Sequence, residues 1–374
     1  MNKKRTYLVI TPFFPSKGFF IGSYIFDQVI ELKNQTSFSI EVIKVVSLFS
    51  NEKDYVFEGI KVSVFKVIDL PWFILPGIFN TLNKLRFHYF LKNKGIEDID
   101  FVHAHIAYPS SYLIEDFDCQ RIVQHHGLDV LQLLNGRVSF IKKLQRRYLI
   151  RNTIKQLNKV DLNIGVSNLV LNQLRSFADY SPINEYVLYN GVDTNKFFLK
   201  DRKENSKFII GCVANFWHIK DQLTLIKSVK ILKEEGLDIL LRLVGTGSTL
   251  KECKLYVNKN RLSEIVIFEK EIEHVELNDF YNNIDLFVLP SYYEALGCVY
   301  LESWATNTPF IGIEGQGIAE LIPNHEKEKL LAIKKSVDSL KEKILGEYNR
   351  RRSYPFVSKY DIKSTIKEFV DSCL

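Results

Sequence analysis

Two glutamates eight positions apart, Glu294 and Glu302, are the side chains best placed to do chemistry. The apolar run 286–289 before them predicts a buried strand, which a Pro-Ser pair ends. From residue 298 onward apolar side chains recur with helical spacing, and Glu302 lies off the apolar face. We therefore expect a strand, a turn that carries one carboxylate, and a helix that carries the other.

The start of this helix, at Gly297 and Cys298, is suited to bind an anion. The first backbone N–H groups of a helix have no partner within the helix and carry a positive partial charge, which favours phosphate. Glu302 would lie about 7 Å along the helix axis. Carboxylates repel phosphate but accept hydrogen bonds from the hydroxyl groups that riboses and sugars carry. The stretch therefore predicts a site for a sugar nucleotide.

The Leu-Pro-Ser strand exit at 289–291, followed by the two glutamates, resembles the signature of family 4 glycosyltransferases. These are retaining enzymes with the two-domain GT-B fold. The resemblance implies an α/β protein with two Rossmann-like domains that face each other across a cleft. It places an acceptor-side domain at 1–198, a donor-nucleotide domain at 199–356, and a C-terminal helix, within 357–374, that crosses back to the first domain.

The order of apolar runs agrees with two αβ series, because strands alternate with helical patterns in both halves of the chain. The strands predicted in the first half are 7–10, 38–47, 101–104, 121–124 and 162–166. Those predicted in the second half are 208–213, 240–244, 265–268, 286–289 and 310–313.

The resemblance also assigns roles in the second half. Glu294 would bind the hydroxyls of the transferred sugar, and Glu302 the hydroxyls of the ribose. Lys220 matches a lysine that neutralises the departing diphosphate, whereas Asn215 stands where an arginine is common. Backbone groups of the turn would fix the sugar ring, and a Gly-x-Gly turn would lie near the nucleotide. The further donor-binding residues implied are Ala295, Leu296, Gly297, Cys298 and Gly245.

Two loops in the first half match the family as well. The turn after strand 121–124 resembles its His-Gly-x-Asp turn, so His126 would lie beside the transferred sugar and Asp129 would orient the acceptor or the loop. Gly22 lies just before a helix, where the absence of a side chain lets the backbone approach a ligand closely. We expect it to contribute to the donor site.

Two patterns that suggest a metal are better explained otherwise. Asp98 and Asp100 form a DxD motif, but they precede a strand, and ligands of open α/β sheets bind beyond the opposite, carboxyl ends. His103 and His105 share one strand face, yet no acidic residue or cysteine has the spacing of a zinc partner. We expect structural histidines and a transfer reaction that needs no metal cofactor.

Composition limits the other classes of function. The 374 residues are 46% hydrophobic and 25% charged, which is typical of a globular protein with two domains. The net charge of +6 suits anionic ligands or an anionic membrane better than nucleic acid. Five scattered cysteines, with no CxxC pair, favour reduced thiols in a cytoplasm. The N-terminus resembles a first strand and not a signal peptide, and no run approaches a spanning helix.

The aromatic and apolar stretch 68–90 and the basic helix 140–154 leave two interpretations open. The first could be a helix pair that closes the sheet, and the second a solvated face. Together they could instead form a surface for an anionic membrane, with apolar side chains at the interface and basic ones at the headgroups.

These observations favour a retaining hexosyltransferase that moves a sugar from a nucleotide-diphospho-sugar to a glycan or lipid-linked acceptor. Surface polysaccharide synthesis, as in capsule or lipopolysaccharide, would suit such an enzyme, in the cytoplasm or at the inner face of the membrane. A sugar-nucleotide epimerase or hydrolase on the same fold is the alternative. A binding protein without activity is another, suggested by Asn215 and by Asn307, which replaces a family glycine.

Overall fold

The chain divides into two compact units, each built around its own sheet. The computed structural model describes residues 5–69, 78–127, 130, 140–201, 206–350 and 354–374, with the side chains of 140–146 left out. Unit 1 comprises Met1–Tyr189 and Thr365–Leu374, and unit 2 comprises Asn190–Ser364. The boundaries expected from the sequence follow residues 198 and 356, whereas the divisions between the units follow residues 189 and 364.

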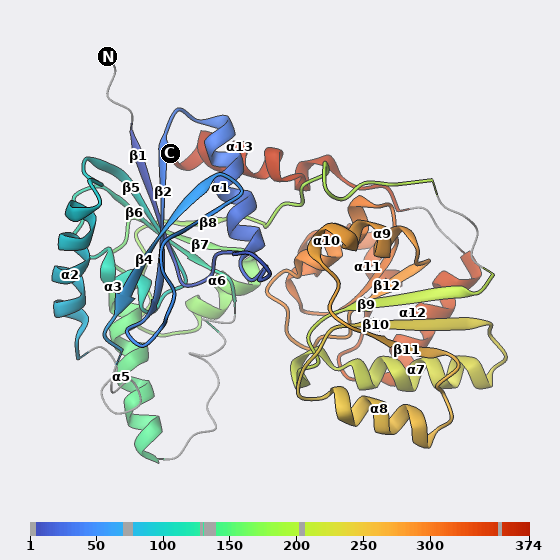
Figure 1. Ribbon diagram of the computed structural model, residues 1–374. Helices are drawn as coiled ribbons and strands as arrows, with labels where there is room; N and C mark the ends of the chain where they lie inside the picture. The colour runs from blue at the N-terminus through green and yellow to red at the C-terminus, as the bar shows by residue number, and fades with distance from the viewer. Residues whose placement is uncertain (1–4, 70–77, 128–129, 131–139, 202–205, 351–353) are drawn as a thin grey trace. The chain divides into compact units, whose positions relative to one another are not determined.

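Unit 1 contains an eight-stranded sheet. Its strands are β1 (Thr6–Thr11), β2 (Ser39–Ser47), β3 (Tyr55–Phe57), β4 (Ile60–Val67), β5 (Ile99–His105), β6 (Gln120–His125), β7 (Leu162–Gly165) and β8 (Glu185–Val187). They are ordered β3-β4-β2-β1-β5-β6-β7-β8, and all pairs are parallel except β3 with β4 (Figure 1). The central strand β1 is buried from Tyr7 onward, as expected for a parallel sheet with both faces covered.

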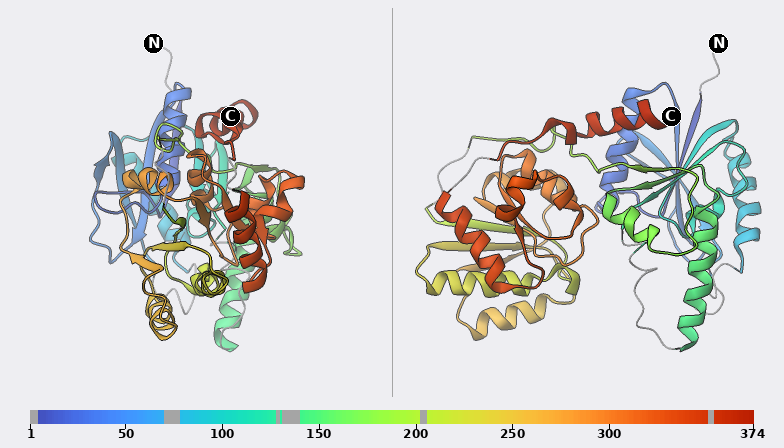
Figure 2. Two further views of the ribbon diagram at one scale, coloured as in Figure 1. Left: turned by 90° about the vertical axis from the view of Figure 1, so that its right-hand side faces the viewer. Right: turned by 180° about the vertical axis from the view of Figure 1, so that it is seen from behind.

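Helices cover both faces of this sheet. They are α1 (Ser23–Gln35), α2 (Asn80–Asn93), α3 (Ser110–Leu113), α5 (Phe140–Leu157), α6 (Asn168–Arg175) and α13 (Ile362–Cys373). The ribbon shows α2 on one face and α1 and α13 on the other (Figures 1 and 2). Among the helices of the described residues, none is both long and apolar enough to span a membrane.

The C-terminal helix α13 completes the core of unit 1. Phe369 is fully buried, and its ring centroid lies 6.2 Å from that of His103 and 6.0 Å from that of Tyr186. The side-chain amide of Gln120 donates to the backbone carbonyl of Cys373 over 3.0 Å. The expectation that a C-terminal helix returns to the first domain is confirmed.

Unit 2 contains a six-stranded parallel sheet. Its strands are β9 (Phe208–Val213), β10 (Ile239–Val244), β11 (Val266–Glu269), β12 (Leu286–Val288), β13 (Phe310–Ile313) and β14 (Leu331–Ala332). The order is β11-β10-β9-β12-β13-β14 (Figure 1). The helices are α7 (Gln222–Glu234), α8 (Leu250–Lys259), α9 (Leu277–Asn282), α10 (Cys298–Ala305), α11 (Asn324–Leu330) and α12 (Val337–Arg350), with short 3₁₀ turns η1 (His218–Lys220), η2 (His274–Glu276), η3 (Gly317–Glu320) and η4 (Ser358–Tyr360).

This strand order locates the ligand edge of unit 2. The chain leaves β9 toward β10 on one side and later returns to β12 on the other side, so the order reverses between β9 and β12. Ligands of open α/β sheets bind beyond the carboxyl ends of the strands at such a switch point. The loops that follow β9 and β12 are therefore the first place to look for a site.

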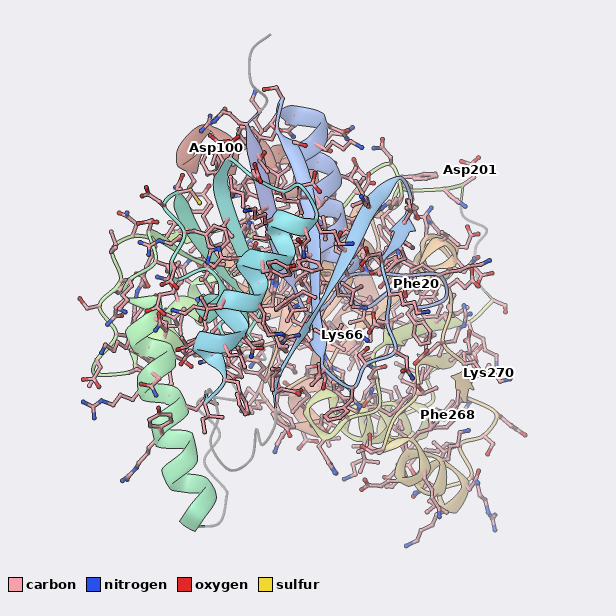
Figure 3. The ribbon with its side chains drawn as sticks, turned by 60° about the vertical axis from the view of Figure 1, so that its left-hand side comes forward. Phe20, Lys66, Asp100, Asp201, Phe268 and Lys270 are labelled. Atoms are coloured by element: carbon pink, nitrogen blue, oxygen red, sulfur yellow. The ribbon has the colours of Figure 1, made fainter. Side chains whose placement is uncertain are left out.

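The DxD motif lies at the edge of the unit 1 sheet where β1 and β5 begin. Asp100 is at the amino end of β5, and its carboxylate accepts a hydrogen bond from the backbone N–H of Thr6 over 2.7 Å. Figure 3 shows Asp100 at one end of the unit 1 sheet and Lys66, near the carboxyl end of β4, toward the other. The motif joins the beginnings of β1 and β5, away from the carboxyl ends where ligands bind.

Candidate functional site

An ion pair joins the two loops at the switch point of unit 2. Glu294, in the loop after β12, is 9% exposed, and its carboxylate forms a short salt bridge with the ammonium of Lys220. Lys220 ends η1, in the loop after β9. The backbone N–H of Tyr292 also donates to the carbonyl of Ile219 over 2.9 Å. The sheet therefore brings together two residues that are 74 positions apart in the chain.

The backbone of Glu294 is fixed from the other side by the loop after β13. Its N–H donates to the side-chain oxygen of Gln316 over 2.7 Å. Its carbonyl accepts a hydrogen bond from the N–H of Gly317 over 3.0 Å. Both backbone groups and the carboxylate of Glu294 are thus occupied, which holds the side chain in one place.

Glu302 lies within α10 and is 8% exposed. Its Oε2 accepts a hydrogen bond from the Tyr281 hydroxyl over 2.8 Å, and its Oε1 lies 3.6 Å from Nε2 of His274. Burial, followed by the nearby Glu302 carboxylate, holds the pKa of Tyr281 well above its usual range. Tyr281 therefore stays protonated, and its hydroxyl donates a hydrogen bond to the carboxylate.

Glycines allow the loops around these glutamates to touch. Gly297, before α10, has φ +83°, and a Cβ there would lie 2.8 Å from the ring of Tyr300. A Cβ on Gly317 would lie 1.7 Å from the carbonyl oxygen of Ala295. No larger residue fits this close backbone contact. The turn before α10 is thus packed directly against η3.

Position 245 requires glycine for a steric reason. Its φ is +135°, and a Cβ there would lie 2.3 Å from the carbonyl oxygen of Ala214, in the loop after β9. This contact explains why glycine is needed at the end of β10. Its predicted part in donor binding stays a prediction.

The other donor-side residues border the same edge. Asn215 is exposed, and its carbonyl accepts a hydrogen bond from the side chain of Gln222 over 3.0 Å. Cys298, the first residue of α10, is partly buried, and its sulfur accepts from the amide of Asn190 over 3.4 Å. Leu296 is buried in the core, so only its backbone is available to a ligand.

His126, a predicted residue of unit 1, belongs to a stack of histidines. Nε2 of His126 lies 2.9 Å from Nδ1 of His105, and their rings stack at 5.2 Å. His103 stacks on His105 at 4.4 Å. Burial lowers the pKa of His103 to about 3 and holds the pKa of His105 well below its usual range, so both are neutral at physiological pH. Tyr24 packs on His126 with ring centroids 4.8 Å apart.

Gly22 lies just before α1 with φ +89°, and a Cβ there would lie 2.6 Å from the carbonyl oxygen of Phe13. The glycine is needed for this close backbone approach, while its proximity to a donor stays a prediction. Asp129, the predicted acceptor-side residue, lies outside the described residues.

Three partners of the predicted residues were missed at the sequence level: Tyr281, Gln316 and His105. Gln316 lies in the loop after β13, and its side-chain role was not expected. Tyr281 is embedded in an apolar helical pattern, and no local signal distinguishes it from a core residue. Within the described part of the chain, no three His, Cys, Asp or Glu side chains are grouped so as to hold a metal.

Two family models match consecutive parts of the chain. The model for Glycosyltransferase Family 4 matches residues 42–196, and the model for Glycosyl transferases group 1 matches residues 193–350.

Curated relatives are similar over parts of their length. An O-antigen chain mannosyltransferase of Salmonella typhimurium is 26% identical over 244 residues, which are 63% of this chain and 65% of that protein. A capsular polysaccharide biosynthesis glycosyltransferase of Staphylococcus aureus is 30% identical over 150 residues, which are 37% of this chain and 38% of that protein. The matched part thus spans 38% to 65% of these two relatives.

Solved structures share the fold over nearly the whole chain. A sucrose-phosphate synthase from Thermosynechococcus elongatus aligns with a TM-score of 0.72 and 15% identity, covering 99% of this chain and 94% of that one. An Anabaena protein in complex with UDP and glucose aligns with a TM-score of 0.69 and 16% identity, covering 98% of both chains. The predicted α/β class with two Rossmann-like domains is confirmed.

The ion pair at the switch point predicts a specific stability effect. Lys220→Met leaves the buried Glu294 carboxylate without its cation, so we expect a loss of about 3–5 kcal/mol in the free energy of unfolding. The double variant Lys220→Met/Glu294→Gln should lose much less, because no charge remains buried. Urea denaturation of the wild type, both single variants (Lys220→Met and Glu294→Gln) and the double variant measures the coupling energy.

The control is Lys230→Met, which breaks the pair between Lys230 and Glu234 on the surface of α7. It should change stability little, because exposed ion pairs contribute little. If the single and double Lys220 variants were equally unstable, the pair would not be coupled in solution.

Proposed function

This chain is a family 4 glycosyltransferase with the GT-B fold, and we propose that it transfers a hexose, with retention, from a nucleotide-diphospho-sugar. The observation that carries the proposal is the arrangement after β12. There the buried Glu294, paired with the partly buried Lys220 from the loop after β9, and a second buried glutamate flank the amino end of α10. This combines cationic groups for a diphosphate with acceptors for sugar hydroxyls.

Lys220 and the amino end of α10 stabilise the leaving group in this proposal. As the bond from sugar to diphosphate breaks, negative charge grows on the phosphate oxygens, and preorganised donors lower its energy. The diphosphate competes with Glu294 for the ammonium of Lys220. Glu294, partly released from the pair, then accepts hydrogen bonds from the sugar, while Glu302 accepts them from the ribose. The role of His126 beside the transferred sugar stays a prediction from the family resemblance.

The acceptor we propose is a glycan or a lipid-linked sugar in surface polysaccharide synthesis. The relatives support this class by their names, since one is named an O-antigen chain mannosyltransferase and another a capsular polysaccharide biosynthesis glycosyltransferase. An epimerase, a hydrolase or a binding protein without activity remain the competing functions. Incubation with UDP-, GDP- and ADP-sugars separates them: transfer to an acceptor, an epimer or free sugar alone, or binding without turnover.

A membrane surface is the second part of the proposal. Apolar side chains are exposed along one face of α2, where Leu85 is 65% and Tyr89 is 68% exposed. The basic residues Arg147 and Arg151 are exposed on α5. An anionic bilayer matches this combination, with apolar side chains at its interface and arginines at its headgroups.

Glu115 ties these two helices together. Lys84 of α2 donates to Glu115 over 2.9 Å, and Gln156 of α5 donates to it over 3.1 Å. The two helices lie on the same side of the unit 1 sheet (Figure 1). The rest of the expected membrane surface, residues 70–77 and the side chains of 140–146, lies outside the described residues.

Substitution of Glu294 and of Glu302 should change different kinetic parameters. We expect Glu302→Ala to raise the KM for the donor with kcat nearly unchanged, and Glu294→Ala to lower kcat. A hydrogen bond to a charged group is worth roughly 1.5–3 kcal/mol, so each change should be on the order of tenfold to a hundredfold. Steady-state kinetics measures both, with the exposed Glu264→Ala as control. Full activity of either site variant would remove the basis of the proposal.

Transfer should not need a divalent metal. Fixed positive groups at the predicted diphosphate position would compete with a cation for the same oxygens, so activity should survive EDTA. Lys220→Ala should cost roughly 2–4 kcal/mol of transition-state stabilisation, the range for removing one donor aimed at developing negative charge. If EDTA abolished transfer and Mn²⁺ restored it, the assignment of Lys220 would be wrong.

The membrane surface predicts flotation with vesicles. The protein should float with liposomes that contain phosphatidylserine at low salt, where the electrostatic attraction is least screened. It should float less with neutral liposomes, which do not attract the basic residues. Leu85→Glu should weaken flotation at least severalfold. Leu255→Glu, at a similarly exposed leucine of α8, should not. Absence of flotation with anionic vesicles would exclude this surface.

A further inference from the structure

The Tyr281 hydroxyl forms a hydrogen bond with Glu302 that the sequence did not suggest. Tyr281 comes from α9 and Glu302 from α10, 21 positions later. The hydroxyl donates to Oε2 over 2.8 Å within a buried environment. A hydrogen bond to a buried carboxylate is stronger than one between neutral groups and is directional. It therefore fixes the plane of the carboxylate as well as its position.

The ring of Tyr281 is itself immobilised. It is fully buried and packs against Phe197, Phe280 and Phe287 at centroid distances of 6.0, 5.8 and 5.6 Å. Its backbone carbonyl accepts a hydrogen bond from the Thr308 hydroxyl over 2.9 Å. A side chain held on all these sides can turn its hydroxyl only toward Glu302.

The two oxygens of the Glu302 carboxylate therefore have different surroundings. Oε2 is occupied by Tyr281, whereas Oε1 has His274 at 3.6 Å, beyond a good hydrogen bond. Oε1 is thus the better placed oxygen for a ligand hydroxyl. A carboxylate held in this way disfavours a ligand that lacks the hydroxyl, because Oε1 then receives no hydrogen bond from the ligand.

We propose that Tyr281 is a positioning residue that fixes Glu302 to recognise the ribose of the nucleotide and to discriminate against deoxyribose. The proposal rests on the proposed function, and in particular on Glu302 as the ribose acceptor. It adds a second residue to ribose recognition, one that does not touch the ligand. Tyr281 acts only through the carboxylate.

The test compares nucleotide pairs that differ by one hydroxyl. UDP, GDP and ADP are each measured beside their 2′-deoxy and 3′-deoxy counterparts by titration calorimetry. We expect wild-type protein to prefer one ribonucleotide over its deoxy forms by about tenfold or more. Tyr281→Phe should reduce this ratio to about threefold or less. With the matching sugar donor, its KM should rise about tenfold while kcat changes by less than about threefold.

Tyr300→Phe is the matched control. Tyr300 is equally buried in the same unit, but its hydroxyl donates to the carbonyl of Leu289 over 2.9 Å. Both variants lose one buried hydrogen bond, so their thermal stabilities should fall by similar amounts. Only Tyr281→Phe should change the ribose-to-deoxyribose ratio. Replacement of Tyr281 by 4-aminophenylalanine, which keeps a donor at the same place, should restore the ratio, and it serves as the test if Tyr281→Phe does not fold.

The outcomes separate the proposal from its premise. If Tyr281→Phe keeps the wild-type ratio while Glu302→Gln loses it, Tyr281 is merely structural and the proposal is overturned. If Glu302→Gln also keeps the ratio, Glu302 is not the ribose acceptor, and the proposal falls with it while transfer activity stands. If wild-type protein binds none of the nucleotides, the proposed function itself fails.

Discussion

Two carboxylates buried at one sheet edge are the constraint on which unit 2 depends. Glu294 and Glu302 are each less than a tenth exposed, and an isolated charge in such a place costs several kcal/mol. Lys220 and Tyr281 offset this cost, and both come from other elements, η1 and α9. The elements can therefore take only positions that deliver these partners. The geometry of the candidate site and the stability of the sheet edge have the same origin.

Close backbone contact is the second constraint at this edge. Gly245, after β10, lies against the loop after β9, and Gly317, after β13, lies against the loop after β12, so neither position leaves room for a side chain. At Gly297 the ring of Tyr300 fills the space that a side chain would need. Water is excluded from such contacts, which strengthens the electrostatic interactions of the neighbouring charges. These glycines thus affect the chemistry of the site without contacting a ligand, because the close contacts that they allow exclude water and restrict motion of the loops.

The sequence was sufficient where the signal is local. The strand predicted at 286–289 is β12, Leu286–Val288, and the helix predicted from residue 298 is α10, since a buried apolar run and a glycine cap are encoded within a few residues. The contacts of Tyr281 with Glu302 and of His105 with His126 were not foreseen. Each joins residues 21 positions apart, and only the packing of neighbouring elements decides which side chains meet. Strand β4, Ile60–Val67, was not predicted either. The short strands β3 and β14 were missed because pairing with a neighbour defines them more than composition does.

The division of unit 1 between the two ends of the chain has a consequence for its synthesis. Phe369 closes the core beside His103, but it belongs to a segment that leaves the ribosome only after all of unit 2. At ~5–20 residues per second, this delay is on the order of ten seconds or more. During that time the nascent sheet has an uncovered apolar face, on which a chaperone can bind or another chain can aggregate. The first unit can therefore be completed only after the whole of the second has been synthesised.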